Sequence, residues 1–207
     1  MAWRNRSGSA GSSWSRSRPT TSLLNPDTPP RRYVITGGPS AGKEAVFTEL
    51  AERRIPNTEG EPAREIYRRH RERLGRHLQV GDRRAYSRDV LEAFIAEYCA
   101  HTAGLHFYNR GIPDGYGWDA FFGLGPYTEL EQAARVYRYD AVFILDALDY
   151  FNSADDDVWA KEREIRRVHE LIIQGYYDAG YRPIFVPADD AGRRVDFMLA
   201  QLPVPAV

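Results

Sequence analysis

The segment GGPSAGK at residues 37–43 constrains the fold of this chain more than any other feature. It matches the pattern G-x-x-x-x-G-K, follows the short β-branched run RYVIT (32–36), and leads into a helical pattern at 42–54. Glycines let backbone N–H groups turn inward around phosphate oxygens, and the helix N-terminus adds a positive dipole end. A strand, loop, lysine and helix in this order predict a phosphate-binding loop rather than a glycine-rich turn with an incidental lysine.

The lysine of this loop stands out against the composition of the chain. Among 28 basic residues only Lys43 and Lys161 are lysines, and all the others are arginines. A compact ammonium on a flexible stem fits beside phosphates better than a planar guanidinium does. We therefore predict Lys43 to be catalytic, and we expect nucleotide contacts from the whole loop. The residues of that predicted nucleotide site are Gly38, Pro39, Ser40, Ala41, Gly42, Lys43 and Glu44.

Length and composition predict a single folded domain at 32–203, preceded by a disordered tail at 1–31. The chain has 207 residues, of which 43% are apolar, and this is enough to form a substantial core. The composition excludes a wholly disordered, collagenous or coiled-coil protein. The tail is rich in Ser, Arg and Pro and has almost no aliphatic residues. An organellar transit peptide and a basic arm that binds a partner remain alternatives for it.

Charge and hydropathy exclude several further classes. Residues 1–32 carry six Arg and one Asp, and because the whole chain has a net charge of −1, the remainder is at −6. An acidic body argues against nucleic-acid binding. No apolar run approaches the ~18 residues of a membrane span, so we expect a cytoplasmic protein. The only cysteine, Cys99, excludes an intramolecular disulfide, and its apolar helical surroundings predict a buried, inert thiol.

Apolar runs alternate with helical patterns along the body. This alternation predicts an α/β fold with a mostly parallel sheet of about five strands. The stretch 111–127, rich in glycine and aromatic residues, is predicted to be irregular. The expected strands are 32–36, 55–61 (weakened by Pro56 and Gly60), 105–109, 141–145 and 182–187. The expected helices are 42–54, 62–79, 83–102 (capped by Asp82), 128–137, 158–179 and 190–202.

An ordered set of segments extends the pattern beyond the loop. They are VITGGPSAGK (34–43), EPAREI (61–66), YNRGIPDG (108–115), YDAVFILDALDYF (139–151), the run from RVHELI to IFVP (167–187) and RRVDFML (193–199). In this order they resemble the small AAA-like P-loop ATPase/kinase family, which includes the ribosylnicotinamide kinase domain of the bacterial NAD-biosynthesis regulator. The resemblance spans about residues 32–202, nearly the whole body.

The resemblance implies a P-loop NTPase of nucleotide-kinase type that binds ATP or GTP with Mg²⁺. Glu61, near the end of the second strand, would face the substrate and orient the acceptor, although it could instead be an acid at a helix N-terminus. The pair after the third strand, here Asn109 and Arg110, would serve metal and substrate. The loop 146–157 would act as a lid that carries arginines.

Three positions depart from the family pattern. Glu44 follows the lysine where Ser or Thr would place a hydroxyl on Mg²⁺, and Asn109 replaces an Asp. The lid has no arginine; the nearest basic residues are Lys161 and Arg163. Glu44 can bind the metal, weaken the site or face solvent near the helix N-terminus. One hypothesis is that Glu44 supplies the carboxylate that Asn109 lacks, so we assign both to the metal.

Other polar and aromatic residues extend the candidate site. Arg64 and Asp114 are predicted to bind substrate, and Arg110 to be catalytic with Lys43 and Glu61, because ligands of open α/β sheets bind beyond the carboxyl ends of strands. His169 is predicted to be structural, since the histidines show no metal-ligand spacing. An aromatic group can wall a substrate pocket or fill the core. Its members are Tyr116, Trp118, Phe121 and Phe122.

Two functions are consistent with these residues. The first is an ATP- or GTP-dependent phosphotransferase on a small hydroxyl-bearing metabolite, or an NTPase, with Mg²⁺ as the metal. The second is a regulatory module that binds nucleotide with little or no turnover. Glu44, Asn109 and the arginine-poor lid favour the second function, and the intact phosphate loop is compatible with both.

Overall fold

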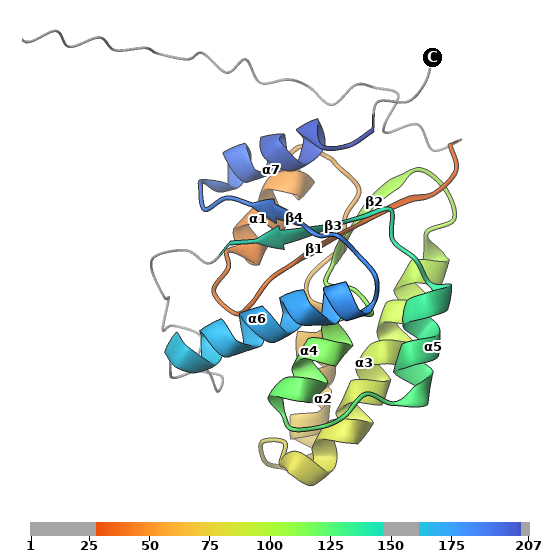
Figure 1. Ribbon diagram of the computed structural model, residues 1–207, viewed down its shortest axis with the longest axis vertical. Coiled ribbons are helices and arrows are strands. Elements are labelled where there is room, and N and C mark those ends of the chain that lie inside the picture. Colours follow the sequence, from red (N-terminus) through yellow and green to blue (C-terminus); the bar gives the residue numbers. More distant parts are fainter. Residues whose placement is uncertain (1–27, 147–161, 204–207) are drawn as a thin grey trace, which may run out of the picture.

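A computed structural model of the chain describes residues 28–146 and 162–203 (Figure 1). Residues 1–27 of the predicted tail and all but the first residue of the predicted lid lie outside this part. The elements are β1 (Arg31–Thr36), α1 (Lys43–Glu52), α2 (Pro62–Leu74), α3 (Val80–Ala100), β2 (Leu105–Asn109), α4 (Asp114–Phe121), α5 (Thr128–Val136), β3 (Ala141–Leu145), α6 (Glu162–Asp178), β4 (Ile184–Val186) and α7 (Ala191–Ala200).

The sheet is parallel throughout and has the order β2-β1-β3-β4. Strand β1 lies between its two partners, so that Ile35 pairs with Asn109 of β2 and with Phe143 of β3. Successive residues of a strand point to opposite faces. Accordingly, Tyr33 and Ile35 belong to one buried cluster and Val34 to the other. This arrangement confirms the predicted α/β class.

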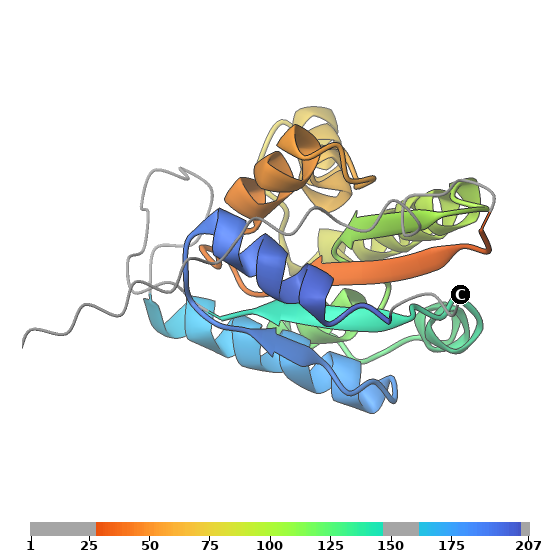
Figure 2. The same cartoon turned by 90° about the horizontal axis from the view of Figure 1, so that it is seen from above.

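Helices cover both faces of the sheet. Helices α1 and α7 pack on one face through apolar residues such as Leu50 and Met198. The opposite face is covered by α3, α5 and α6, with Phe94, Leu130 and Ile172 in its core. Figures 1 and 2 show the sheet between these two helical layers. No helix in the described segments is both long and apolar enough to cross a membrane.

The predicted fifth strand at 55–61 is reduced to one bridge in the structure. Asn57 forms an isolated parallel bridge with Phe107 of β2. The amide of Phe107 donates to the carbonyl of Pro56 (3.0 Å), and the amide of Thr58 donates to the carbonyl of Phe107 (2.9 Å). Because Pro56 has no N–H, the ladder cannot extend through it. The described sheet therefore has four strands, and this segment continues its β2 edge.

Two local predictions for α3 are wrong. The helix begins at Val80, and its N-cap is Gln79 rather than Asp82. Asp82 is the third helical residue and accepts the amide hydrogen of Gln79 at 2.8 Å, as in a capping box. Cys99, near the other end of α3, is exposed instead of buried. Helical periodicity alone did not determine which face of α3 meets the core.

Helix α4 (Asp114–Phe121) lies in the stretch predicted to be irregular. Two glycines lower its local helix propensity, but one of them allows close packing on α6. A Cβ atom added to Gly117 would lie 2.6 Å from the backbone of Ile172. On α6, a Cβ added to Gly175 would lie 2.9 Å from the carbonyl of Pro113. Tertiary packing therefore requires the glycines that suggested a loop.

Replacing Gly117 with alanine is expected to destabilise the fold by about 2 kcal/mol, because the new methyl group forces α4 away from the backbone of α6. Gly81→Ala is the matched control, since Gly81 also lies in a helix but has open space where a Cβ would point. Its stability should be unchanged or slightly higher. Urea unfolding of both variants measures the difference. Equal stabilities would show that the α4–α6 contact is not close-packed.

Candidate nucleotide-binding site

The loop at 37–42 lies where β1 ends and the chain connections diverge to the two sides of the sheet. In open α/β sheets this switch point is where ligands bind. Gly42, the N-cap of α1, has φ +79° and no side chain to cap the helix, and Ser40 has φ +58°. A left-handed residue lets the loop turn tightly into the helix. The predicted phosphate loop therefore has the conformation and the uncapped helix end that bind an anion.

Lys43 is the first residue of α1, and its ammonium folds back over this loop. Nζ donates to the carbonyls of Gly38 (3.1 Å) and Gly37 (3.4 Å), and the residue is only 8% exposed. Within the described residues it forms no ion pair with a carboxylate. Burial, followed by the nearby charge of Arg110, lowers the pKa of Lys43 to about 7. The site thus holds a buried amine that an anion would stabilise as a cation.

His169 of α6 supports the loop from the side. Its Nδ1 accepts the amide hydrogen of Gly38 at 3.0 Å, and a Cβ on Gly38 would come within 2.9 Å of the Cβ of His169. Gly38 therefore belongs to the loop's support and is absent from the cavity wall, unlike Pro39 and the residues that follow it. The prediction that His169 is structural did not include this contact with the phosphate loop.

Arg110 joins the loop to the two predicted substrate-side carboxylates. It follows β2 directly, in a left-handed conformation with φ +72°. Nε donates to Glu61 at 2.7 Å, while Nη1 donates to Asp114 and to the carbonyl of Gly37, each at 3.1 Å. Burial lowers the pKa of Arg110, but the charges of Glu61 and Asp114 raise it by more than burial lowers it. The pKa is therefore above its ordinary value, and the guanidinium stays charged.

Asp114 lines the cavity wall, and its carboxylate is bonded to Arg110 and to three other protein donors. Its carboxylate accepts hydrogen bonds from Thr36 (2.6 Å), Tyr176 (2.6 Å) and the amide of Gly111 (2.9 Å), in addition to Arg110. The residue is 1% exposed, and four protein donors occupy its two oxygens. We predicted Asp114 to bind substrate, but this geometry favours a positioning role.

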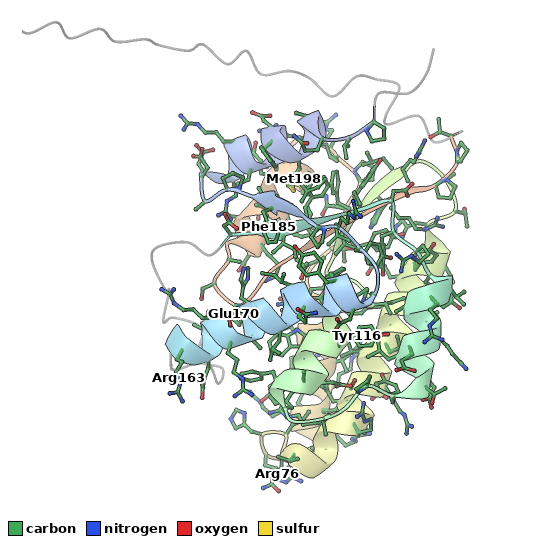
Figure 3. The ribbon with its side chains drawn as sticks, in the orientation of Figure 1. Arg76, Tyr116, Arg163, Glu170, Phe185 and Met198 are labelled. Atoms are coloured by element: carbon green, nitrogen blue, oxygen red, sulfur yellow. The ribbon has the colours of Figure 1, made fainter. Side chains whose placement is uncertain are left out.

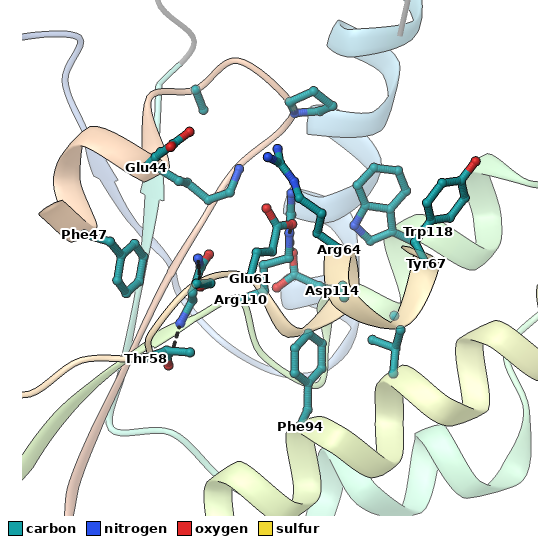
Figure 4. A pocket seen from close by; sticks show the side chains of 18 of the residues that line it. Glu44, Phe47, Thr58, Glu61, Arg64, Tyr67, Phe94, Arg110, Asp114 and Trp118 are labelled. Atoms are coloured by element: carbon teal, nitrogen blue, oxygen red, sulfur yellow. Dashed lines mark hydrogen bonds and ion pairs between the residues drawn. The ribbon is translucent and has the colours of Figure 1, made fainter. Parts of the chain in front are cut away.

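Glu61 is the N-cap of α2 and points toward the centre of the cavity (Figure 4). Burial raises the pKa of Glu61, but the charges of Arg110 and Lys43 outweigh this effect and hold it at about 2. A carboxylate with so low a pKa accepts hydrogen bonds but is a poor proton acceptor at neutral pH. Glu61 is therefore suited to orienting a hydroxyl group rather than to keeping its proton.

A cavity of about 1120 Å³ begins at the phosphate loop and continues between α2, α3 and α4. It exceeds the size of most single-ligand pockets, so a nucleotide end and an acceptor end can be accommodated together. Exposed Arg64 lines it and lies beside Glu61 (Figure 4). Of the four predicted aromatic residues, Trp118 and Phe122 line this cavity, whereas Tyr116 and Phe121 pack against the core. The other aromatic residues in the wall are Phe47, Tyr67, Tyr86, Phe94 and Tyr127.

The two predicted metal ligands both line the cavity but differ in burial. Glu44 is exposed in the first turn of α1. Asn109 is buried: its Nδ2 donates to the carbonyl of Gly60 at 2.6 Å, and its Oδ1 has no hydrogen-bond partner in the described part of the chain. Residues 28–146 and 162–203, which the structure describes, contain no cluster of three or more Asp, Glu, His or Cys side chains that could hold a metal ion. The predicted lid at 146–157, which contains no arginine, falls almost entirely in a segment that the structure does not describe.

Comparison with known proteins agrees with this geometry. The sequence matches a family model described as an AAA domain over residues 32–194. No curated protein matches it. Among solved structures, a thymidylate kinase from Ehrlichia chaffeensis is similar with a TM-score of 0.58 at 12% identity, over 84% of this chain and 100% of that chain. A deoxyadenosine kinase from M. mycoides gives a TM-score of 0.57 at 13% identity, over 82% and 97%.

The NadR protein, solved in complex with NAD and AMP-PNP, is also similar to this chain. Its TM-score is 0.51 at 16% identity, over 86% of this chain and 51% of that chain. At these identities the likeness establishes the fold, and the family model covers most of the body. Together they confirm the resemblance to small AAA-like P-loop proteins: the chain belongs to the AAA-domain family that the model describes.

Proposed function

We propose that this protein is an ATP- or GTP-dependent phosphotransferase that acts on a hydroxyl group of a small metabolite. The observation that supports this most directly is the buried, carboxylate-free ammonium of Lys43 at one end of a cavity that continues past Glu61. A nucleotide phosphate would neutralise the positive charge of that ammonium. The remaining cavity volume would hold the acceptor, with its hydroxyl directed toward the terminal phosphate.

The transfer step requires positioning and charge rather than a strong base. The acceptor oxygen forms a bond to the γ-phosphorus while the bond from that phosphorus to the β,γ-bridging oxygen breaks, and the nucleoside diphosphate leaves. Glu61 accepts a hydrogen bond from the acceptor hydroxyl, whose proton passes to solvent. Lys43 and Arg64 offset the charge on the transferred group. Arg110 fixes Glu61, and Asp114 fixes Arg110.

The residues present fit a magnesium ion that arrives with the nucleotide. Mg²⁺ is usually held by one or two protein oxygens together with phosphates and water. The partnerless Oδ1 of Asn109 is one suitable oxygen, and the carboxylate of Glu44 would be the other. When bound, the ion would neutralise negative charge that develops on the phosphates. This division of ligands retains the charge that an Asp at position 109 would supply.

Calorimetry with ATP and GTP, with and without Mg²⁺, tests the binding part of the proposal. Binding in the micromolar range that Mg²⁺ strengthens is the expected result. Turnover is then followed by release of ADP or GDP in the presence of hydroxyl-bearing metabolites. Nucleotide binding without acceptor-dependent turnover would favour the regulatory module instead. An absence of binding at millimolar nucleotide would contradict both functions.

A further inference from the structure

The cavity wall on α3 contains an arginine that has no carboxylate partner among the described residues. Arg83, in the first turns of α3, lies over the ring of Phe122 with its Cζ 3.9 Å from the ring centroid. Its Nη2 donates to the carbonyl of Leu78 at 3.2 Å. In the described part of the chain, this is the guanidinium's only hydrogen bond to protein, although arginine has five N–H donors.

The neighbouring charges of this region are already paired. Asp82, next in sequence, accepts from Arg76 at 2.6 Å and from the amide of Gln79 at 2.8 Å. Asp119, one of two acidic residues of α4 in the wall, accepts from Arg84 at 2.6 Å. Arg83 therefore differs from the arginine beside it, which has its own carboxylate.

The surroundings of Arg83 are aromatic rather than acidic. Burial lowers the pKa of Arg83, and the groups that next influence it are the hydroxyl-bearing rings of Tyr67 and Tyr86. Both tyrosines line the cavity. A half-buried guanidinium with unused donors is stabilised strongly when an oxyanion accepts them, because charge-assisted hydrogen bonds are the strong ones. A cationic group placed in the same space would be repelled.

A row of contacts links Arg83 to the phosphate end of the cavity. The Cζ of Arg110 lies 5.4 Å from the ring of Trp118, whose ring centroid is 6.1 Å from that of Phe122, which Arg83 covers. Figure 4 shows Trp118 and Tyr67 on the far side of Glu61 and Arg64 from Glu44. Glu61 and Arg83 also line the same cavity, so we infer that one metabolite can contact both.

We propose that the phosphate acceptor is an anion whose carboxylate or phosphate group binds Arg83, at the end of the molecule opposite the hydroxyl that is phosphorylated. This inference rests on the proposed phosphotransferase function and specifies its substrate class. The acidic side chains of α1 in the cavity wall are Glu44, in the first turn beside the phosphate loop, and Glu49 and Glu52 further along the same helix.

Matched acceptors with and without an anionic group test the inference. One set is uridine, orotidine (a carboxylate) and uridine 3′-monophosphate (a phosphate); the other is glucose, glucuronate and glucose 6-phosphate. With saturating ATP and Mg²⁺, the anionic members should show at least tenfold higher kcat/KM than the neutral member of their set. Calorimetry with AMP-PNP present measures acceptor binding directly, and the carboxylate and phosphate arms identify which oxyanion is preferred.

Substitutions of Arg83 separate a ligand contact from a structural role. Arg83→Gln should lower kcat/KM for the preferred anion by roughly 10- to 100-fold, mainly through KM, and leave the neutral acceptor within about twofold. Arg83→Lys should retain part of the preference. Arg88→Gln is the control, because Arg88 is an exposed residue of the same helix, outside the cavity wall, that pairs with Glu129 at 3.3 Å. This control should leave kcat/KM unchanged for both the anionic and the neutral acceptor.

The failures of the two proposals are distinguishable. If the protein binds neither ATP nor GTP, the phosphotransferase function and this inference both fall before any acceptor is added. If ATP binds normally but no anionic compound binds better than its neutral counterpart, the inference alone is overturned. The same conclusion follows if Arg83→Gln weakens neutral and anionic acceptors equally, since Arg83 would then act only on the local fold.

Discussion

Replacing Lys43 with methionine is expected to abolish nucleotide binding and yet stabilise the free protein. Methionine has a similar length and carries no charge, so it removes the cost of burying an ammonium that has no carboxylate partner. The lost hydrogen bonds to two carbonyls offset part of this gain. We expect a net stabilisation of about 2 kcal/mol at pH 7 and a loss of at least ~100-fold in ATP affinity. Thermal unfolding and calorimetry measure the two effects.

The pH dependence of stability follows from the same residue. Folding lowers the pKa of Lys43 from its ordinary value of 10.5 to about 7, so between these values the unfolded chain binds more protons than the folded one. Stability therefore rises with pH across this window, and the full cost of the buried charge is present below pH 7. The advantage of Lys43→Met should accordingly shrink as the pH approaches 10. An advantage that is constant from pH 7 to pH 10 would contradict the buried ammonium.

Nucleotide binding should reverse this shift in the pKa of Lys43. The negative charge of the phosphates favours the protonated form of Lys43, so wild-type protein should take up close to one proton per ATP at pH 8. The affinity for ATP should accordingly fall by up to ~tenfold per pH unit above pH 7. Calorimetry in buffers of different ionisation enthalpy measures the proton. Arg69→Met removes an exposed charge on α2, outside the cavity wall, and should alter neither stability nor affinity by much. Proton uptake that persists in Lys43→Met would assign it to another group.

The local parts of the site were predictable from sequence, because their chemistry is local. The phosphate loop is defined by seven consecutive residues, and the strand and helix on either side follow from periodicity. Arg110 was predicted from its place after a strand of a parallel sheet, and Glu61 from the family resemblance. The contacts that define their roles come from elsewhere: Asp114 is held by Tyr176, 62 positions later in the chain. No spacing rule places a tyrosine of α6 on that carboxylate.

The prediction failed where tertiary packing overrides local preference. Helix α4 looked like a loop because of Gly115 and Gly117, yet close approach to Ile172 is the reason that glycine stands at 117. Arg83 gave no signal because arginine is abundant in this chain. Its interest comes from the structure, which places its guanidinium over the ring of Phe122 in the cavity wall and pairs the nearby carboxylates with other arginines.

Replacing Arg110 with methionine is expected to destabilise the protein by about 3–5 kcal/mol, and to lower its melting temperature by roughly 10 °C. The change leaves the buried carboxylate of Asp114 with neutral donors only, and it removes the closest charge that lowers the pKa of Glu61. Arg110→Lys keeps a charge but cannot match the three acceptors that the guanidinium fork bonds. We therefore expect it to recover part of the stability while acceptor-dependent turnover remains at least ~100-fold reduced.

A double-mutant cycle distinguishes this network from simple packing. If Arg110 and Glu61 act as a pair, Glu61→Gln combined with Arg110→Met should cost 1–3 kcal/mol less than the sum of the two single changes, because the second substitution removes a carboxylate that has already lost its partner. Thr48→Ser, an exposed substitution in the α1 wall of the cavity, is the control and should be additive with Arg110→Met. Additivity of Arg110→Met with Glu61→Gln would mean that Arg110 stabilises the loop through Gly37 and Asp114 alone. Glu61 would then orient the acceptor without help from the guanidinium.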